Sequence, residues 1–255
     1  MQQAYGKAYA QVYNKKWTGF ATSISPKIEA LLQSRPTFDR LPKTLLDICC
    51  GTGQLASHFL SKGYIVHGLD LSPYMIEIAR DNNKTHVSAR TASFSIQDAS
   101  QFRLQTPFSY VTCLFDAMNH LDSIQSVISC FQHTYEVLAS QGLFVFDINT
   151  RKGLHRWNSL SVQEDDEVFI LNRGVFEDNM DRAYTQITGF LRGSDGRYER
   201  FSETAYNLVL SVQQLLDALN EQGFSNCYCA SSDDLSAPVP DPEGLGRAYI
   251  VSQKL

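Results

Sequence analysis

The 255-residue sequence has little that would suit a nucleic acid or a membrane. It carries 22 Lys and Arg against 27 Asp and Glu, a formal net charge of −5, and it contains no Lys/Arg run. Because a nucleic-acid backbone is bound through clustered positive charge, we expect no nucleic-acid partner. No segment approaches the roughly 18 apolar residues that span a bilayer, and the opening residues lack a signal-peptide pattern. We therefore expect a cytoplasmic protein without membrane contact.

Metal-ligand spacing is also lacking. The six cysteines do not form the paired CxxC spacing of a zinc site, and no pair of histidines lies near them. Most of them stand in apolar strand or helix patterns, where a reduced cysteine acts as a small hydrophobic residue. We expect no metal to be bound by the six, which are Cys49, Cys50, Cys113, Cys130, Cys227 and Cys229.

What the sequence has, from about Thr44 to Thr150, is a regular alternation of strand and helix patterns. Short apolar runs such as TLLDICC, YIVHGLD and GLFVFDI alternate with helical patterns such as PYMIEIARDN. Such alternation is typical of a parallel sheet covered by helices on both faces. We expect an α/β, Rossmann-like doubly wound fold with a mostly parallel seven-stranded sheet.

The segments before and after this core read differently. Residues 1–40 show two helical patterns, the second one expected to start at Ser25-Pro26 and to run to about Leu32. Within residues 151–209, stretches around 167–176, 182–191 and 198–209 alternate apolar and polar positions as antiparallel strands do, with a tight turn at 193–196. We expect a single domain with a helical lid (1–40), a core (41–150 and 210–255) and an antiparallel insert (151–209).

The stretch LLDICCGTGQLASHF, residues 45–59, places a glycine turn between the first strand and the next helix. Glycine allows a ligand to approach the backbone closely, and the N-terminus of the helix offers free N–H groups to an anion. Both a pyrophosphate and an amino-acid carboxylate satisfy that demand. The turn alone therefore does not decide between a dinucleotide and another nucleoside as the ligand.

Two acidic residues narrow the choice. Asp47, four residues before Gly51, would repel a pyrophosphate but could pair with an ammonium group. Asp70 closes the second strand, where a carboxylate can accept hydrogen bonds from both ribose hydroxyls. Together they favour a nucleoside that carries a zwitterionic amino acid, such as S-adenosylmethionine.

These residues also carry a family resemblance. The segment LLDICCGTGQLASHFLSKGYIVHGLDLSPYMIEIAR resembles the first two motifs of class I S-adenosylmethionine-dependent methyltransferases. Asp47, Gly51 and Gly53 match the acidic-x-Gly-x-Gly-x-Gly motif, and Cys49 stands where the first glycine is usual. IQDASQF resembles the segment that meets the adenine. The cofactor-binding residues that the resemblance implies are Asp47, Cys49, Gly51, Gly53, Asp70, Leu71, Met75, Asp98, Ala99 and Leu114.

The likeness extends to one subgroup. QVYNKKW, DAMNHL and the antiparallel insert resemble the small-molecule N-methyltransferases, above all those that act on amino sugars. The resemblance implies that a methyl group passes to a small-molecule acceptor, and it favours a nitrogen over an oxygen as the accepting atom. It leaves open which acceptor is used and how many methyl groups are transferred.

His120 and Tyr13 are the candidate catalytic residues. An ammonium acceptor must lose a proton before it attacks, so a general base within hydrogen-bond reach is useful. His120 follows the fourth strand and suits a base near neutrality. Tyr13 matches the N-terminal helix of the similar enzymes, where a tyrosine faces the methyl group. Which of the two acts as base stays open.

The insert is expected to supply the acceptor pocket or a homodimer surface. Its candidate residues are Trp157, Asn158, Arg200, Glu203 and Tyr206, and Glu203 could hold a cationic amine. Two alternatives to the methyltransferase stand. Gly51-x-Gly53-x-x-Ala56 with Asp70 would also suit an NAD-dependent oxidoreductase, and a fold of this class can bind a cofactor without turnover.

Overall fold

The computed structural model describes residues 5–255. Its larger sheet has seven strands in the order β10-β11-β5-β4-β1-β2-β3. All neighbours pair in parallel except β11, which is antiparallel to both β5 and β10. The strands are β1 (Thr44–Ile48), β2 (Ile65–Asp70), β3 (Ala92–Ile96), β4 (Phe108–Cys113), β5 (Leu138–Asn149), β10 (Ser225–Ala230) and β11 (Arg247–Gln253). The prediction of a mostly parallel seven-stranded sheet is confirmed.

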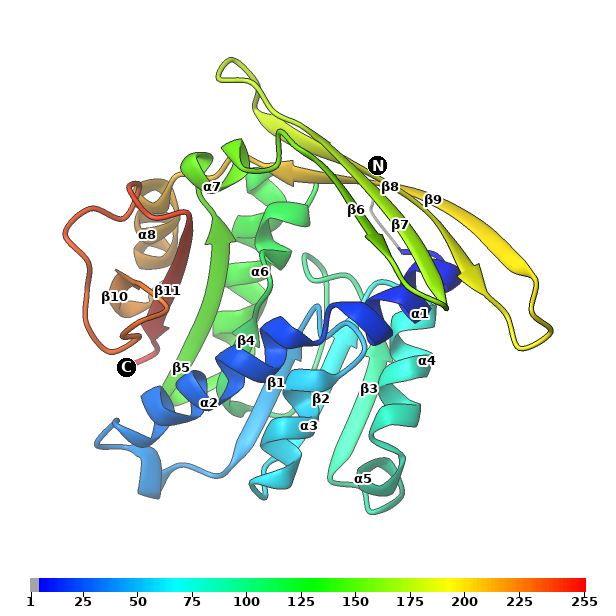
Figure 1. Ribbon diagram of the computed structural model, residues 1–255. Coiled ribbons are helices and arrows are strands. Elements are labelled where there is room, and N and C mark those ends of the chain that lie inside the picture. The colour runs from blue at the N-terminus through cyan, green and yellow to red at the C-terminus, as the bar shows by residue number, and fades with distance from the viewer. Residues whose placement is uncertain (1–4) are drawn as a thin grey trace.

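Helices cover both faces of this sheet (Figure 1). On one face α6 (Ile124–Val137) and α8 (Val212–Glu221) bury an apolar stripe against the strands. On the other face α2 (Gly19–Gln33), α3 (Gln54–Ser61) and α4 (Pro73–Asn82) do the same. Shorter helices are α5 (Lys84–Ser88), α7 (Arg151–His155), η1 (Phe38–Arg40) and η2 (Ala117–His120).

The start of α2 differs from the prediction. The helix begins at Gly19, and Pro26 lies inside it rather than in its first turn. Pro26 has no N–H to donate, yet its fixed φ is compatible with helical geometry. The Ser25 hydroxyl donates to the Ala21 carbonyl at 2.6 Å, so Ser25 bonds back into the preceding turn instead of capping. Burial of Ile24, Ile28, Leu31 and Leu32 against the sheet outweighs the cost of the proline.

The second sheet is the antiparallel insert. It consists of β6 (Leu160–Glu164), β7 (Val168–Val175), β8 (Arg182–Arg192) and β9 (Tyr198–Leu208), paired in sequence order. The turn at 193–196 joins β8 to β9 as expected, with Gly196 at φ +79°. The sequence analysis did not identify β6, since all five of its residues are exposed and it forms the edge of the sheet.

The insert arches over the carboxyl ends of the parallel strands, and α1 (Lys7–Lys16) lies between the two (Figure 1). Buried residues of α1 pack against the inner face of the insert and against Met75 of α4. Two exposed ion pairs, Lys15–Glu167 and Lys16–Asp165, join the helix to the turn between β6 and β7. Within residues 5–255, the structure contains no helix that is long and apolar enough to cross a membrane.

Candidate active site

A cavity of about 460 Å³ lies where the carboxyl ends of the parallel strands, α1 and the inner face of the insert meet. The sheet order reverses between β1 and β4 at this edge. Ligands of open α/β sheets bind at such a switch point because the loops on either side diverge and leave a crevice. The volume is within the usual range of small-molecule sites.

The turn after β1 adopts backbone angles that L side chains rarely take. Cys49, Gly51 and Gly53 have φ values of +55°, +53° and +80°. A Cβ atom at Gly53 would lie 2.9 Å from the Asn83 amide nitrogen, so this position needs glycine for space as well as for conformation. Cys49 takes the left-handed conformation that glycine adopts easily. Both Cys49 and Gly51 line the cavity.

Asp70, at the end of β2, faces the cavity and supports the turn. Its two carboxylate oxygens accept the N–H groups of Gly51 at 3.0 Å and of Ser72 at 2.9 Å. Burial raises the pKa of Asp70, and the hydrogen bonds from these backbone N–H groups oppose that effect. Each oxygen keeps a further lone pair, which can accept a hydroxyl proton from a ligand.

The other expected cofactor residues continue around the same wall. Asp98 accepts hydrogen bonds from Ser100 and Gln101, which hold the loop after β3 in place. Apolar side chains alternate with these polar groups and give a slot for a flat ring. The residues of this group that line the cavity are Leu71, Met75, Asp98, Ala99 and Leu114.

The structure does not place Asp47 or Gly53 on the cavity wall. Asp47 is 3% exposed and lies beneath the turn, where it accepts the Thr112 hydroxyl at 2.8 Å. Burial raises the pKa of Asp47 to about 7; the Thr112 bond lowers it and the nearby Asp70 raises it further. A direct ion pair between Asp47 and a ligand's ammonium group therefore stays a prediction.

Four aromatic side chains on α1 or next to its ends form the opposite wall. Tyr5, Tyr9, Tyr13 and Trp17 all line the cavity, and Tyr5 stacks on Tyr9 with ring centroids 4.2 Å apart. Desolvation raises the pKa of Tyr13, and the negative charges of Asp70, Asp116 and Asp47 raise it further. A raised pKa leaves Tyr13 a neutral phenol, which can donate a hydrogen bond, and whether Tyr13 or His120 acts as base stays a prediction.

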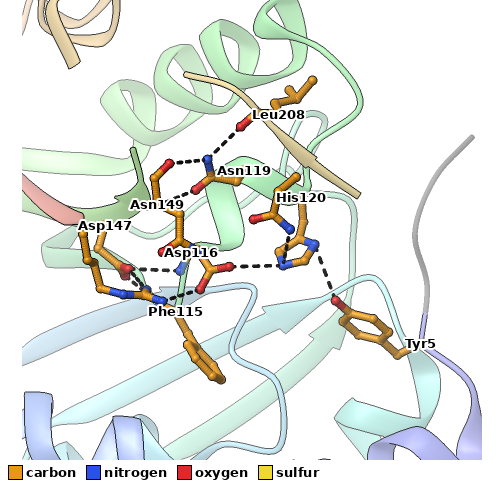
Figure 2. A network of polar contacts seen from close by, with 10 residues as sticks. Tyr5, Phe115, Asp116, Asn119, His120, Asp147, Asn149 and Leu208 are labelled. Atoms are coloured by element: carbon orange, nitrogen blue, oxygen red, sulfur yellow. Dashed lines mark hydrogen bonds and ion pairs between the residues drawn. The ribbon is translucent and has the colours of Figure 1, made fainter. Parts of the chain in front are cut away.

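His120 lies at the end of η2, on the wall of the cavity (Figure 2). Its Nδ1 atom is 3.5 Å from the Tyr5 hydroxyl. Its Nε2 atom is 3.5 Å from Asp116 Oδ2 and 3.5 Å from the Asn207 amide nitrogen. The structure thus brings both candidate catalytic residues, His120 and Tyr13, to one cavity.

Three charged residues beside His120 were missed by the sequence analysis. Arg247 of β11 contacts the carboxylates of both Asp116 and Asp147. Burial raises the pKa of Asp116, but the charges of Arg247 and His120 more than offset it, so the net shift is downward. Asp116 follows β4 and Asp147 lies on β5, so no local motif links the three. The available signals were Asp116 in DAMNHL and a charged residue within the apolar run GLFVFDI.

The insert residues divide between its two faces. Trp157 lines the cavity, whereas the exposed Asn158 lies outside its lining. Tyr206 packs edge-on against Tyr184, on the face of the sheet away from the cavity, and Arg200 shares that face. Glu203 accepts the Gly6 N–H at 3.1 Å and so fastens the start of α1, rather than lining the cavity. Over residues 5–255, no group of three or more His, Cys, Asp and Glu could hold a metal ion.

Comparison with known proteins gives the class of this site. Residues 45–142 match the family model of the methyltransferase domain. Residues 45–142 therefore carry a methyltransferase domain, as the resemblance of the motifs predicted.

Individual relatives agree with this class. The chain is 29% identical over 214 residues to a protein of Geobacillus sp. (strain WCH70) provisionally named a methyltransferase, covering 83% of this chain and 85% of the relative. It is 38% identical over 78 residues to the dTDP-3-amino-3,6-dideoxy-alpha-D-glucopyranose N,N-dimethyltransferase of Streptomyces fradiae, covering 31% and 28%. An S-adenosylmethionine-dependent methyltransferase from Clostridium acetobutylicum ATCC 824 shares the fold, with a TM-score of 0.77, 22% identity and coverage of 97% and 98%.

Proposed function

We propose that this methyltransferase transfers a methyl group from S-adenosylmethionine to an amine nitrogen of a small molecule. The observation that carries the proposal is one cavity with two unlike parts. One part has Asp70, the glycine turn and an apolar slot; the other has His120 and Asp116 facing an aromatic wall. A nucleoside cofactor suits the first part, and a polar acceptor suits the second.

The residues fit the cofactor at each of its functional groups. Asp70 has lone pairs for the ribose hydroxyls, and Leu71, Met75, Ala99 and Leu114 give an apolar slot for the adenine. The backbone at Cys49 and Gly51 leaves room for the amino-acid portion. The tyrosines of α1 present π faces and lone pairs to a sulfonium. When bound, S-adenosylmethionine supplies an electrophilic methyl group that an acceptor lone pair can take by in-line displacement.

The residues of the chain then have distinct tasks. The wall formed by α1 excludes water from the reacting groups, and Tyr13, a neutral phenol, orients them through a hydrogen bond. His120 takes the proton that an ammonium acceptor must lose, so that the nitrogen lone pair is free to attack. Most of the rate comes from holding the acceptor in line with the methyl group.

Charge favours an amine over a hydroxyl acceptor. Asp116 lines the cavity as a carboxylate whose pKa is lowered by Arg247 and His120 against the effect of burial. A second acidic side chain, Asp122, also lines it. A negative field attracts a cationic amine and offers a neutral hydroxyl no comparable gain.

The test is to incubate the chain with S-adenosylmethionine and matched pairs of amino and hydroxy compounds, amino sugars among them, and to follow S-adenosylhomocysteine and methylated product. We expect N-methyl product and little O-methyl product. O-methylation alone would overturn the acceptor assignment. Cofactor binding without turnover of any acceptor would favour the non-catalytic alternative, and binding of NAD in its place would favour the oxidoreductase.

A homodimer is part of the same proposal. The outer face and the edge of the insert carry exposed apolar side chains, among them Leu160, Val162 and Phe190. Such exposure on a sheet edge is a suitable surface for a second copy. Analytical ultracentrifugation would test it: we expect a dimer that Val162→Glu dissociates, and a monomeric wild-type chain would overturn it. The cytoplasmic location stays a prediction.

A further inference from the structure

We propose that Asp116, held by Asp147 and Arg247, is a positioning residue that keeps the proton of His120 on Nε2, so that Nδ1 receives the acceptor's proton. The inference rests on the proposed function only in naming where that proton comes from. It concerns Asp116 of the DAMNHL segment together with Asp147 and Arg247, and the latter two belong to no methyltransferase motif recognised in the sequence.

The first observation is an unusual backbone. Phe115 and Asp116 are consecutive non-glycine residues with φ values of +65° and +49°. Left-handed conformations are costly for L residues and persist where the surroundings impose them, often at functional sites. Here the Asp147 carboxylate imposes them, because it accepts the N–H of Phe115 at 2.6 Å and that of Asp116 at 3.0 Å. Asp147 is fully buried, so it is a fixed support.

The second observation is the bridge made by Arg247. One guanidinium nitrogen contacts Asp147, and another donates to Asp116 Oδ1 at 2.8 Å. The planar fork of arginine fixes both partners at once, which a lysine cannot do. The guanidinium also lies over the rings of Phe20 and Phe115, 4.8 and 5.7 Å from their centroids. With Oδ1 held by Arg247, the other oxygen of Asp116 is the one directed at His120.

The third observation is that the helical turn carrying His120 is fixed as firmly (Figure 2). The Asn119 amide donates to the carbonyls of Asn149 at 3.0 Å and Leu208 at 2.8 Å, and it accepts the Asn149 N–H at 2.9 Å. These bonds tie η2 to both β5 and β9. His120 is therefore presented to Asp116 by a turn that has little freedom to move.

The groups around His120 then decide which nitrogen carries the proton. Asp116 Oδ2, 3.5 Å from Nε2, can only accept, so it favours a proton on Nε2. The buried Oδ1 of Asn207 has no hydrogen-bond partner among the described residues, and a turn of this amide would place it against the same N–H. On the other side, the Tyr5 hydroxyl lies 3.5 Å from Nδ1 and can donate to it. Burial and the neighbouring Tyr9 and Asp116 raise the pKa of Tyr5, so the phenol keeps its proton. With a proton on Nε2, Nδ1 holds the lone pair that this hydroxyl meets.

The proton transfer follows from this arrangement. One proton leaves the acceptor's ammonium nitrogen for Nδ1 of His120, directly or through the Tyr5 hydroxyl, and the acceptor keeps the electron pair. The imidazole becomes an imidazolium with a proton on each nitrogen. The Asp116 carboxylate stabilises that charge without taking a proton itself, and Arg247 keeps it ionised.

The experiment compares wild type, Asp116→Asn and Arg247→Lys by the ¹⁵N chemical shifts of the His120 ring and by steady-state kinetics, with His120→Gln to assign the resonance. We expect the Nε2–H form in wild type and the Nδ1–H form in Asp116→Asn, whose amide can donate to Nε2. We expect kcat to fall by about 100-fold in Asp116→Asn, with affinity for S-adenosylhomocysteine within about threefold of wild type. The kcat of Arg247→Lys should lie between that of wild type and that of Asp116→Asn.

The matched control is Asp178→Asn, which breaks a surface pair with His155 and should change neither readout. A folded Asp116→Asn variant that keeps the Nε2–H form and wild-type kcat would overturn the inference, and Arg247→Lys equal to wild type would remove Arg247 from it. If wild type methylates no acceptor, the proposed function fails, while the ring shifts still decide the tautomer. Thermal unfolding of each variant shows whether it is folded.

Discussion

The cavity has two halves, and they treat buried negative charge in opposite ways. In the cofactor half, Asp47 and Asp70 have no cationic partner among the described residues, and burial raises the pKa of both. In the acceptor half, Asp116 and Asp147 share Arg247. The first half therefore has negative charge without a cationic partner in the chain, whereas in the second half Arg247 already compensates part of the negative charge. We interpret the first as built for a ligand and the second as built for a fixed geometry.

The largest effect is expected in the acceptor half. Replacement of His120 by alanine removes the proposed base, and kcat should fall by about 100-fold or more. Affinity for S-adenosylhomocysteine should change little, because His120 lies away from the cofactor wall. Steady-state kinetics and calorimetric titration measure the two quantities. The exposed His155→Ala is the control, and full turnover by a folded His120→Ala would exclude a catalytic role.

The uncompensated charge of the cofactor half predicts a pH-dependent stability. The pKa of Asp47 is raised from 3.8 to about 7, so folding loses stability as the pH rises from about 4 to about 7. Asp47→Asn removes this loss. We expect the variant without ligand to be more stable than wild type by about 4 kcal/mol at pH 8 and close to it at pH 4. Urea unfolding at both pH values measures it.

The control for this prediction is Asp217→Asn, a change at an exposed residue of α8 that should give the same difference from wild type at both pH values. A gain for Asp47→Asn that does not depend on pH would mean that burial of the carboxylate is not its cause. The same variant should bind S-adenosylmethionine less tightly, since the turn would have lost negative charge.

Asp70→Asn tests whether the negative charge of the cofactor half contributes to ligand affinity. The variant keeps one acceptor oxygen for the turn but loses the charge and one of the acceptors available to the ribose. Hydrogen bonds to charged groups contribute about 1.5–3 kcal/mol, so the Kd for S-adenosylhomocysteine should rise about 10- to 100-fold. The kcat at saturating cofactor should stay within severalfold of wild type. A kcat loss with an unchanged Kd would place Asp70 in the acceptor half instead.

The smallest effect concerns the ion pairs that join α1 to the insert. Lys15 and Glu167 are both substantially exposed, and such pairs contribute little. Glu167→Gln should change the cofactor Kd by less than about fivefold, and the change should vanish in high salt. A larger change that persists in salt would show that α1 depends on this contact to cover the cavity.

The two halves also differ in how much of them could be predicted from sequence. Gly51 and Asp98 follow strands and Asp70 ends one, each within a short motif, so local reading could predict that the three lie along one cavity. Burial of Asp47 could not be read in this way, because it depends on how β1 packs against Thr112 of β4. Pro26 was taken as a helix start, since the packing of Ile24 and Ile28 of the same helix against the sheet is not visible locally.

The charged residues that hold His120 in place could not be predicted either, because they too depend on contacts between distant segments. Asp116, Asp147 and Arg247 come from three segments up to 131 residues apart and meet only because β11 pairs with β5 beside β4. The edge strand β6 could not be predicted, because a strand is recognised by alternating buried apolar positions and all five residues of β6 are exposed. Long-range pairing and exposed structure are thus the two features that the sequence did not disclose.

The central claim, that the cofactor half binds a zwitterionic nucleoside, is tested most directly by calorimetric titration of the chain with S-adenosylhomocysteine and with NAD⁺. The account predicts one site per chain for S-adenosylhomocysteine, weakened in Asp70→Asn, and no heat of binding with NAD⁺. Binding of NAD⁺ at the same site, or equal affinity of wild type and Asp70→Asn for S-adenosylhomocysteine, would contradict it.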